Sequence, residues 1–176
     1  MYHLALKIAE IECAQSFIVA ISALLHDVWD HKLGFSDKDR ALNIRALLSN
    51  CDETLNPDQM DQIVDIVNSV SFKKGQNHNV PESLEAKIVQ DADRLDALGA
   101  VGIARTFAFG GAHNRPMYLH NMQGERTDSV GHFYEKLFLL KDRMNTETAK
   151  TIANERHRFM VDYMDQFYKE HQDVEL

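Results

Sequence analysis

Apolar residues recur along this chain with the period of an α-helix, and no segment alternates convincingly with the period of a β-strand. The strongest helix start is Asn56-Pro57-Asp58, which joins an N-cap residue to a proline at the first helical position and an acid in the first turn. The apolar face of that helix consists of Ile63, Val64, Val67 and Val70. The sequence therefore predicts an all-α fold.

Further helix boundaries carry similar signals. Ser36 is typical of an N-cap, and two more predicted helices begin at Pro81-Glu82 and at Asn145-Thr146-Glu147. We expect the helix after Pro81 to continue through Phe107, and an earlier helix to end near Trp29. The predicted inward face of that earlier helix is formed by Phe17, Ile21, Leu24 and Val28.

Length and composition favour one domain. A chain of 176 residues lies in the usual range for a single domain, and its 44% hydrophobic content can fill one sizeable core. We therefore predict one helical domain over residues 1–176. Within it, residues 110–131 contain four glycines and a proline between periodic segments, and we expect them to form a flap-like loop.

The charge of the chain restricts its partners. A net charge of −8 argues against a binder of nucleic acid or of a membrane surface, since both need a basic face. A small anionic substrate remains compatible, because a pocket can be locally positive inside an acidic protein. The oligomeric state stays open, a homodimer included.

The predicted location is the cytoplasm. Cys13 and Cys51 have no spacing partner and no metal motif, which is typical of reduced thiols in a cytosolic protein. No basic-then-apolar leader opens the chain, and no apolar run approaches about 18 residues. The first residues look like the middle of a helix without a cap, so we expect the N-terminal helix to be incomplete in this sequence.

The stretch ALLHDVWDH, residues 23–31, places ionisable side chains at the end of an apolar run. His26 and Asp30 are four residues apart, and Asp27 and Asp30 are three apart. On a helix they share roughly one side, next to the apolar stripe. Imidazole and carboxylate groups side by side suit a transition metal or Mn²⁺.

A second stretch, QDADRLDALG at residues 90–99, holds three aspartates in an otherwise apolar helix. Such carboxylates are costly unless they are paired or coordinated. Asp91 and Asp93 lie about 200° apart around a helix, so they cannot both face one site, whereas Asp93 and Asp96 lie within about 60°. Solvated acids and an ion pair with Arg94 explain this stretch equally well.

Three motifs together resemble the HD-domain superfamily of metal-dependent phosphohydrolases. They are ALLHDVWD, then IVQDADRLDALGAVGIARTFAFGG, and finally HFYEKLFLLKDRMNTETAKTIANERHRFM at residues 132–160. The likeness extends over essentially the whole chain and is strongest to a small bacterial branch. It implies an all-α, single-domain helical bundle in which helices hold one divalent metal ion, whether Mn, Co, Ni, Mg or Fe.

The same resemblance implies the ligands of that ion. His26 and Asp27 are the expected ligands, and Asp93 is the closing ligand, with Asp91 as the fallback. The superfamily pattern begins with a further histidine on the preceding helix. His3 is out of phase with that position, so we expect the missing histidine just upstream of Met1.

The resemblance also implies the chemistry. A metal-activated water would attack a phosphate, and Asp30 is placed to take its proton or to orient it. The alternative for Asp30 is to support His26, and the two roles are compatible. The predicted substrate-binding cations are Arg94, Arg105, Lys73 and Lys141. Arg105 follows the apolar stretch VGIA on a helix that we expect to be mostly buried, and a buried arginine must be satisfied, which favours a position facing the pocket.

The leading hypothesis is a metal-dependent phosphohydrolase acting on a nucleotide or a similar small phosphate ester. One alternative is a catalytically inactive binding or regulatory protein with the same scaffold, which only the missing histidine supports. Another is a di-iron oxygenase of the HD type. That reading needs additional histidine ligands, and His31 is the sole extra one near the HD pair.

Overall fold

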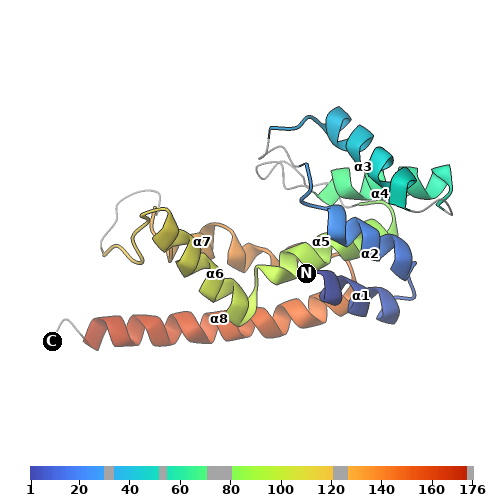
Figure 1. Ribbon diagram of the computed structural model, residues 1–176. Helices are drawn as coiled ribbons and strands as arrows, with labels where there is room; N and C mark the ends of the chain where they lie inside the picture. Colours follow the sequence, from blue (N-terminus) through green and yellow to red (C-terminus); the bar gives the residue numbers. More distant parts are fainter. Residues whose placement is uncertain (30–33, 52–54, 71–80, 121–126, 174–176) are drawn as a thin grey trace. The chain divides into compact units, whose positions relative to one another are not determined.

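The structure is a computed structural model that describes residues 1–29, 34–51, 55–70, 81–120 and 127–173 (Figure 1). These residues form two compact units, Met1–Asp93 and Arg94–Leu176. Every regular element in the described part of the chain is helical, which confirms the predicted all-α fold. Helix α5 (Leu84–Asp96) runs across the division, and the single domain over residues 1–176 stays a prediction.

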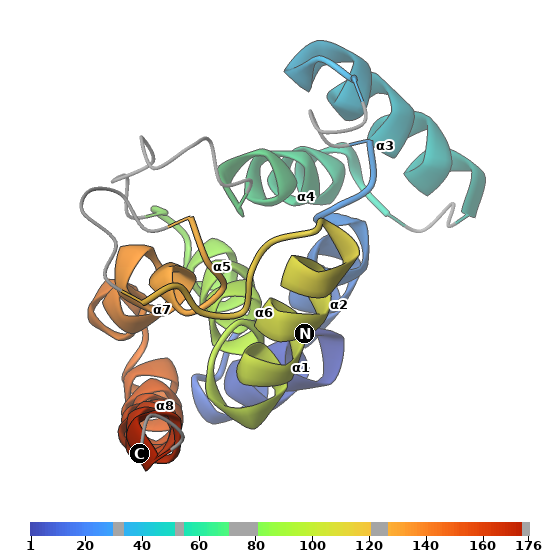
Figure 2. The same cartoon turned by 90° about the vertical axis from the view of Figure 1, so that its left-hand side faces the viewer.

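The first unit contains two helix pairs. Helices α1 (Tyr2–Ile11) and α2 (Ser16–Leu25) form a hairpin, drawn in blue in Figure 1. Helix α3 (Asp37–Cys51) packs on α4 (Pro57–Val70), and α4 also contacts α2; the pair α3 and α4 is clear in Figure 2. Fully buried aliphatic side chains from all five helices form the core: Ile8, Ile18, Ile44, Ile63, Ile66 and Ile88.

The predicted starts of α3 and α4 are confirmed, and both are capping boxes. The hydroxyl of Ser36 accepts a hydrogen bond from the backbone N–H of Asp39, and the Asp39 carboxylate accepts one from the N–H of Ser36. Asn56 and Gln59 make the same reciprocal exchange, at 2.9 and 3.2 Å. Each exchange satisfies two donors that a helix N-terminus leaves without partners.

Helix α2 differs from its prediction in both its end and its buried face. It ends at Leu25, and residues 26–29 form a turn in which Trp29 has a φ of +53°. Phe17 and Leu24, predicted to face inward, are 51% and 61% exposed. The buried positions are instead Ile18, Val19, Ser22 and Ala23. Because α2 is apolar on nearly every side, its periodicity did not identify one face.

The second unit is built around α8 (Glu147–Asp173), with α6 (Gly99–Ala112) packed along it (Figure 1). Between α6 and α8 in the sequence come α7 (Gly131–Glu135) and two 3₁₀ turns, η2 (Leu137–Leu139) and η3 (Lys141–Arg143). The hydroxyl of Thr146 accepts a hydrogen bond from the N–H of Ala149 at 3.3 Å. The predicted start of the last helix is therefore confirmed.

The prediction of one continuous helix from Pro81 to Phe107 is wrong, because two helices cover this range. Helix α5 ends at Asp96, and α6 begins at Gly99, whose φ is +78°. A Cβ atom at Gly99 would lie 3.1 Å from Cγ of Arg156. Glycine tolerates both the left-handed backbone and the close approach, so it allows the chain to change direction after α5.

The connection between α6 and α7 is shorter than predicted. Gly110 and Gly111 lie inside α6 and Gly131 begins α7, so the connecting residues are 113–130, of which 121–126 lie outside the described residues. Asp128 is fully buried and accepts hydrogen bonds from the N–H groups of Leu119, at 2.7 Å, and Gly131, at 2.6 Å. Both ends of the connection are thus held in place, and its role as a flap stays a prediction.

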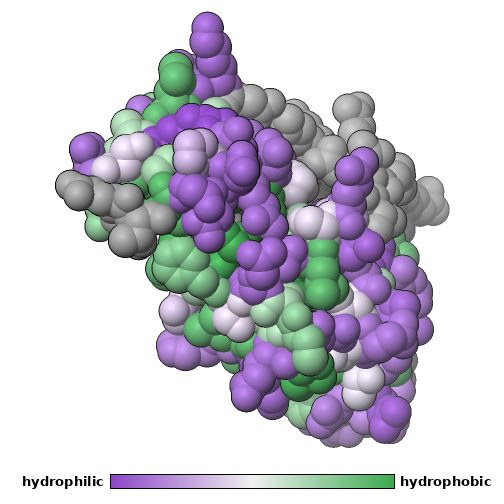
Figure 3. Space-filling model, turned by 90° about the vertical axis from the view of Figure 1, so that its right-hand side faces the viewer, coloured by the Kyte–Doolittle hydropathy of each residue, from purple (hydrophilic) through white to green (hydrophobic). Residues whose placement is uncertain are grey.

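Polar side chains dominate the face drawn in Figure 3, with apolar ones interspersed among them. None of the helices in the described residues is long and apolar enough to cross a membrane.

Candidate metal centre

His26 follows the last residue of α2, and the backbone of that helix holds its ring. Nδ1 of His26 lies 2.8 Å from the carbonyl oxygen of Ala23. A carbonyl oxygen only accepts hydrogen bonds, so Nδ1 must carry a proton. In the neutral ring the lone pair is then on Nε2. Histidines that bind metals are commonly oriented in this way, by a hydrogen bond from the other ring nitrogen.

Two carboxylates lie in front of Nε2. The distance from Nε2 of His26 is 3.0 Å to Oδ2 of Asp27 and 3.8 Å to Oδ1 of Asp93. The His26 side chain is only 15% exposed, whereas those of Asp27 and Asp93 are 73% and 44% exposed. A nitrogen lone pair and carboxylate oxygens repel one another unless a cation or a second proton lies between them. The structure therefore brings the three predicted metal ligands together, with the carboxylates of Asp27 and Asp93 next to Nε2 of His26.

The chemistry of these residues fits a divalent cation. One imidazole nitrogen with two carboxylates suits Mn²⁺ and the later divalent metals of the first transition row. Within the described parts of the chain, however, no group of three or more His, Cys, Asp or Glu side chains is arranged to hold an ion as it stands. His26 with its two carboxylates is thus a partial set of ligands.

Helix α5 separates the three aspartates of the second motif. Asp93 faces His26, whereas Asp91, the fallback ligand, is fully buried. Asp96 accepts a hydrogen bond from Nη1 of Arg105. Of the two alternatives, the position of Asp93 suits the predicted ligand role better than the position of Asp91.

Arg40 is a residue near this site that the sequence reasoning missed. It lies in the first turn of α3, is 1% exposed, and donates from Nη2 to the carbonyl oxygen of His26. It shares one face of α3 with the buried residues Ile44 and Leu48, because the three are spaced four apart. The sequence signal that could have identified Arg40 is its spacing, which places an arginine on the same helix face as the apolar Ile44 and Leu48.

The other predicted site residues fall into two groups. Asp30 and Lys73 lie outside the described residues. Arg94, Arg105 and Lys141 belong to the second unit, so their role in binding substrate stays a prediction. Among the described contacts, Arg94 donates from Nη1 to the carbonyl oxygen of Arg143.

Arg105 and Lys141 differ in their surroundings. The prediction that Arg105 is buried is wrong, since its side chain is 63% exposed and forms an ion pair with Asp96. The new helix start at Gly99 places Arg105 on the outer side of α6. Lys141 is more enclosed and lies 3.6 Å from the carboxylate of Asp142.

Two histidines of the second unit have lowered pKa values. Burial is the main cause of the lowered pKa of His132, followed by the charges of Lys136 and Arg115, while Glu135 opposes them. Burial also lowers the pKa of His157, assisted by Lys141 and opposed by Asp142. Both rings therefore favour the neutral form.

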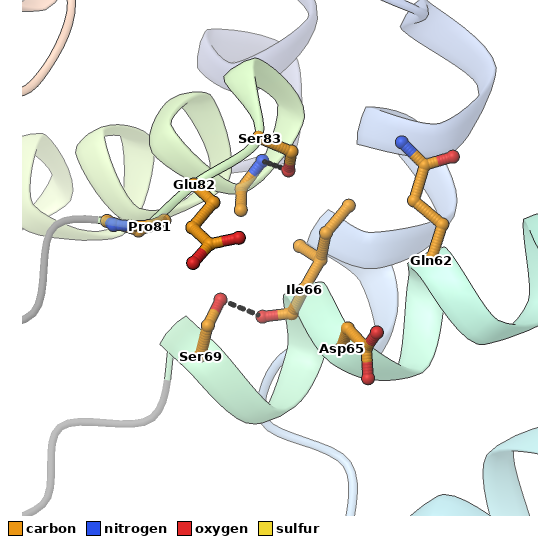
Figure 4. A pocket seen from close by; sticks show the side chains of 8 residues that line it. Gln62, Asp65, Ile66, Ser69, Pro81, Glu82 and Ser83 are labelled. Atoms are coloured by element: carbon orange, nitrogen blue, oxygen red, sulfur yellow. Dashed lines mark hydrogen bonds between the residues drawn. The ribbon is translucent and has the colours of Figure 1, made fainter.

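A cavity of about 290 Å³ lies in the first unit between α4 and the start of α5 (Figure 4). Its lining residues come from these two segments: Gln62, Asp65, Ile66, Ser69, Pro81, Glu82, Ser83 and Ala86. The Ser69 hydroxyl donates to the Ile66 carbonyl oxygen, and the Ser83 hydroxyl accepts from the N–H of Ala86. Because Asp65 and Glu82 would repel a phosphate, this cavity suits an anionic substrate poorly.

Comparisons with known proteins give both a family match and a close relative of this chain. Residues 1–98 match the HD domain. The uncharacterized protein YpgQ of Bacillus subtilis is 40% identical over 173 residues, which are 95% of this chain and 78% of YpgQ.

Solved structures agree with this match. An HD-superfamily hydrolase from Bacillus thuringiensis has a TM-score of 0.81 at 40% identity, covering 97% of this chain and 82% of its own. The structure of YpgQ in complex with ADP has a TM-score of 0.76 at 38% identity, covering 96% of this chain and 84% of its own.

Proposed function

The chain belongs to the HD domain family, and on that premise we propose that it is a divalent-metal-dependent phosphohydrolase acting on a nucleotide or a similar small phosphate ester. The proposal depends chiefly on one observation. Nε2 of His26, with Nδ1 held on the Ala23 carbonyl, faces the carboxylates of Asp27 and Asp93. HD domains typically bind a metal, and these three residues would be its ligands.

A bound divalent cation would supply Lewis-acid stabilisation of a phosphate oxygen and would lower the pKa of water. The chain's own residues have the remaining tasks. The two carboxylates and the imidazole would fix where the phosphate is attacked, and a bound cation would balance the negative charge of the carboxylates. Asp30, three residues after Asp27, would accept the proton of the attacking water as the phosphorus–oxygen bond to the leaving group breaks.

The substrate class rests on two further observations. YpgQ was crystallised with ADP, so a close relative accepts a nucleotide in its structure. In the second unit of this chain, Lys141 lies near His157, and Lys136 and Arg115 lie near His132. The carboxylates of Glu135 and Asp142 lie beside these cations, but lysine and arginine are the side chains that bind a phosphate.

A hydrolysis assay tests the proposal. The full chain is incubated with nucleoside mono-, di- and triphosphates and with simple phosphate esters, in separate reactions with Mn²⁺, Co²⁺, Ni²⁺ and Mg²⁺. Release of phosphate and of pyrophosphate is measured separately, because the two products distinguish the bond that is cut. We expect hydrolysis that requires added metal and is lost in Asp27→Ala.

Arg45→Met is a matched control, since Arg45 lies on α3 and pairs with Asp61, away from these ligands. We expect it to retain full activity. Metal binding without hydrolysis of any substrate would favour the binding or regulatory alternative. Hydrolysis that persists in Asp27→Ala under chelation would contradict the proposed metal dependence.

A further inference from the structure

Arg40 is the largest fully buried charged side chain in the described part of the chain, at 1% exposure. Burying a guanidinium removes it from water, and that cost has to be offset by hydrogen bonds inside the protein. Its position is well defined, because the capping box of Ser36 and Asp39 fixes the first turn of α3. The N–H of Arg40 itself donates to the Ser36 carbonyl oxygen at 2.9 Å.

The partner of Arg40 is the backbone carbonyl group of His26, at the C-terminal end of α2. His26 follows the last residue of α2, where carbonyl oxygens have no partner within the helix and carry partial negative charge. A cation that donates to such a carbonyl satisfies it and interacts favourably with the helix dipole. Three residues later, Trp29 occupies the left-handed region, which costs free energy for a bulky side chain.

His26 is therefore held at two points. Its ring nitrogen Nδ1 is held by Ala23, and its carbonyl oxygen is held by Arg40. The ring contact alone fixes the direction of Nε2 relative to α2, but the contact with α3 fixes the backbone from which the ring projects. We infer that Arg40 is a positioning residue of the candidate metal centre, which keeps Nε2 of His26 directed toward the carboxylates of Asp27 and Asp93. This inference rests on the proposed function.

The test uses three variants of the full chain. Arg40→Met removes the guanidinium and keeps much of the length, Arg40→Lys keeps a cation, and Arg45→Met on the same helix is the control. Binding of Mn²⁺ is measured by calorimetry at a temperature where circular dichroism shows all proteins folded. The tautomer of His26 is measured separately in metal-free, ¹⁵N-labelled protein, by long-range nitrogen–proton correlation in mildly alkaline buffer.

We expect Arg40→Met to bind Mn²⁺ at least about tenfold more weakly than wild type, the range found when a group that orients a metal ligand is removed. Its His26 should lose the single tautomer with the proton on Nδ1. Arg40→Lys should recover part of both properties, and Arg45→Met should resemble wild type. If Arg40→Met does not fold, Arg40→Lys decides the question, with a partial loss of both properties expected.

Two results would overturn the inference. One is a folded Arg40→Met variant with unchanged Mn²⁺ affinity and an unchanged tautomer. The other is weaker Mn²⁺ binding with an unchanged tautomer, which would mean that Arg40 does not act through His26. A wild-type protein that binds no metal, but whose tautomer still depends on Arg40, would refute the proposed function and leave the positioning role standing.

Discussion

Arg156 of α8 donates from Nη1 to the carbonyl oxygen of Leu95, 2.6 Å away, and so satisfies a carbonyl in the last turn of α5. The same side chain lies against Gly99, where the chain turns into α6. Arg156 thus fixes the end of the helix that carries Asp93. In the first unit, Arg40 has the corresponding position at the end of the helix that precedes His26. Each of the two ligand-bearing segments is held by an arginine that belongs to another helix.

Replacing Gly99 by alanine should therefore destabilise the protein. Alanine in the left-handed region costs about 1–2 kcal/mol, and its Cβ would lie 3.1 Å from Cγ of Arg156. We expect the free energy of unfolding in urea to fall by at least this amount. Gly111→Ala is the control, because a Cβ atom there would meet open space within a helix. Equal stability of wild type and Gly99→Ala would contradict the described turn.

His132 should make the protein less stable in mild acid. Its folded pKa lies below the ordinary value of 6.5, because burial, Lys136 and Arg115 disfavour the charged ring. Above about pH 6.5 the ring is neutral in both states, and its contribution to stability is fully present. As the pH falls through the folded pKa, the unfolded chain binds the proton first and that contribution is lost.

Urea unfolding at a series of pH values between neutrality and mild acid checks this expectation. His132→Gln should lose less stability on acidification than wild type, because glutamine does not titrate. Lys136→Met should have an intermediate slope, since it removes one of the charges that lower the pKa of His132. A His132→Gln variant with the same pH dependence as wild type would show that other groups dominate.

Elemental analysis can decide between the two candidate aspartates of α5. The side chain of Asp93 lies 3.8 Å from Nε2 of His26, whereas Asp91 is fully buried. After loading with Mn²⁺ and removal of excess metal, we expect Asp93→Ala to hold much less metal than wild type. Equal metal content in wild type and Asp93→Ala would reject Asp93 as a ligand. We would then expect the folded fraction of Asp91→Ala to hold less metal than wild type.

Local signals in the sequence were sufficient for the starts of α3, α4 and α8, whereas α5 begins at Leu84, after Ser83, and not at Pro81. The caps at Ser36, Asn56 and Thr146 are formed by neighbouring residues, so their patterns identified them without knowledge of packing. The meeting of His26 and Asp93 followed from a resemblance between motifs rather than from spacing, because the two residues belong to different segments of the chain.

Packing decided what the sequence patterns left open. Helix α2 is apolar on most sides, so only its neighbours determine that Ile18 is buried and Leu24 is exposed. The contact of Arg40 with His26 depends on how α3 packs in the first unit, which no local pattern encodes. The break at Gly99 reverses the expected burial of Arg105, because a new helix begins with its own phase.

Asp30 lies outside the described residues, and its predicted role follows from its place in the sequence, three residues after Asp27. If Asp30 accepts the proton of the attacking water, Asp30→Asn should keep the fold and the metal while lowering kcat by roughly 10²-fold or more. The amide has nearly the same shape as the carboxylate but cannot accept that proton. If Asp30 only supports His26, the same substitution should weaken metal binding, and excess Mn²⁺ should restore most of the rate. Titration of wild type and variant with Mn²⁺ separates the two roles, and we expect the loss to persist at saturating metal. Full activity of Asp30→Asn at ordinary metal concentration would exclude both.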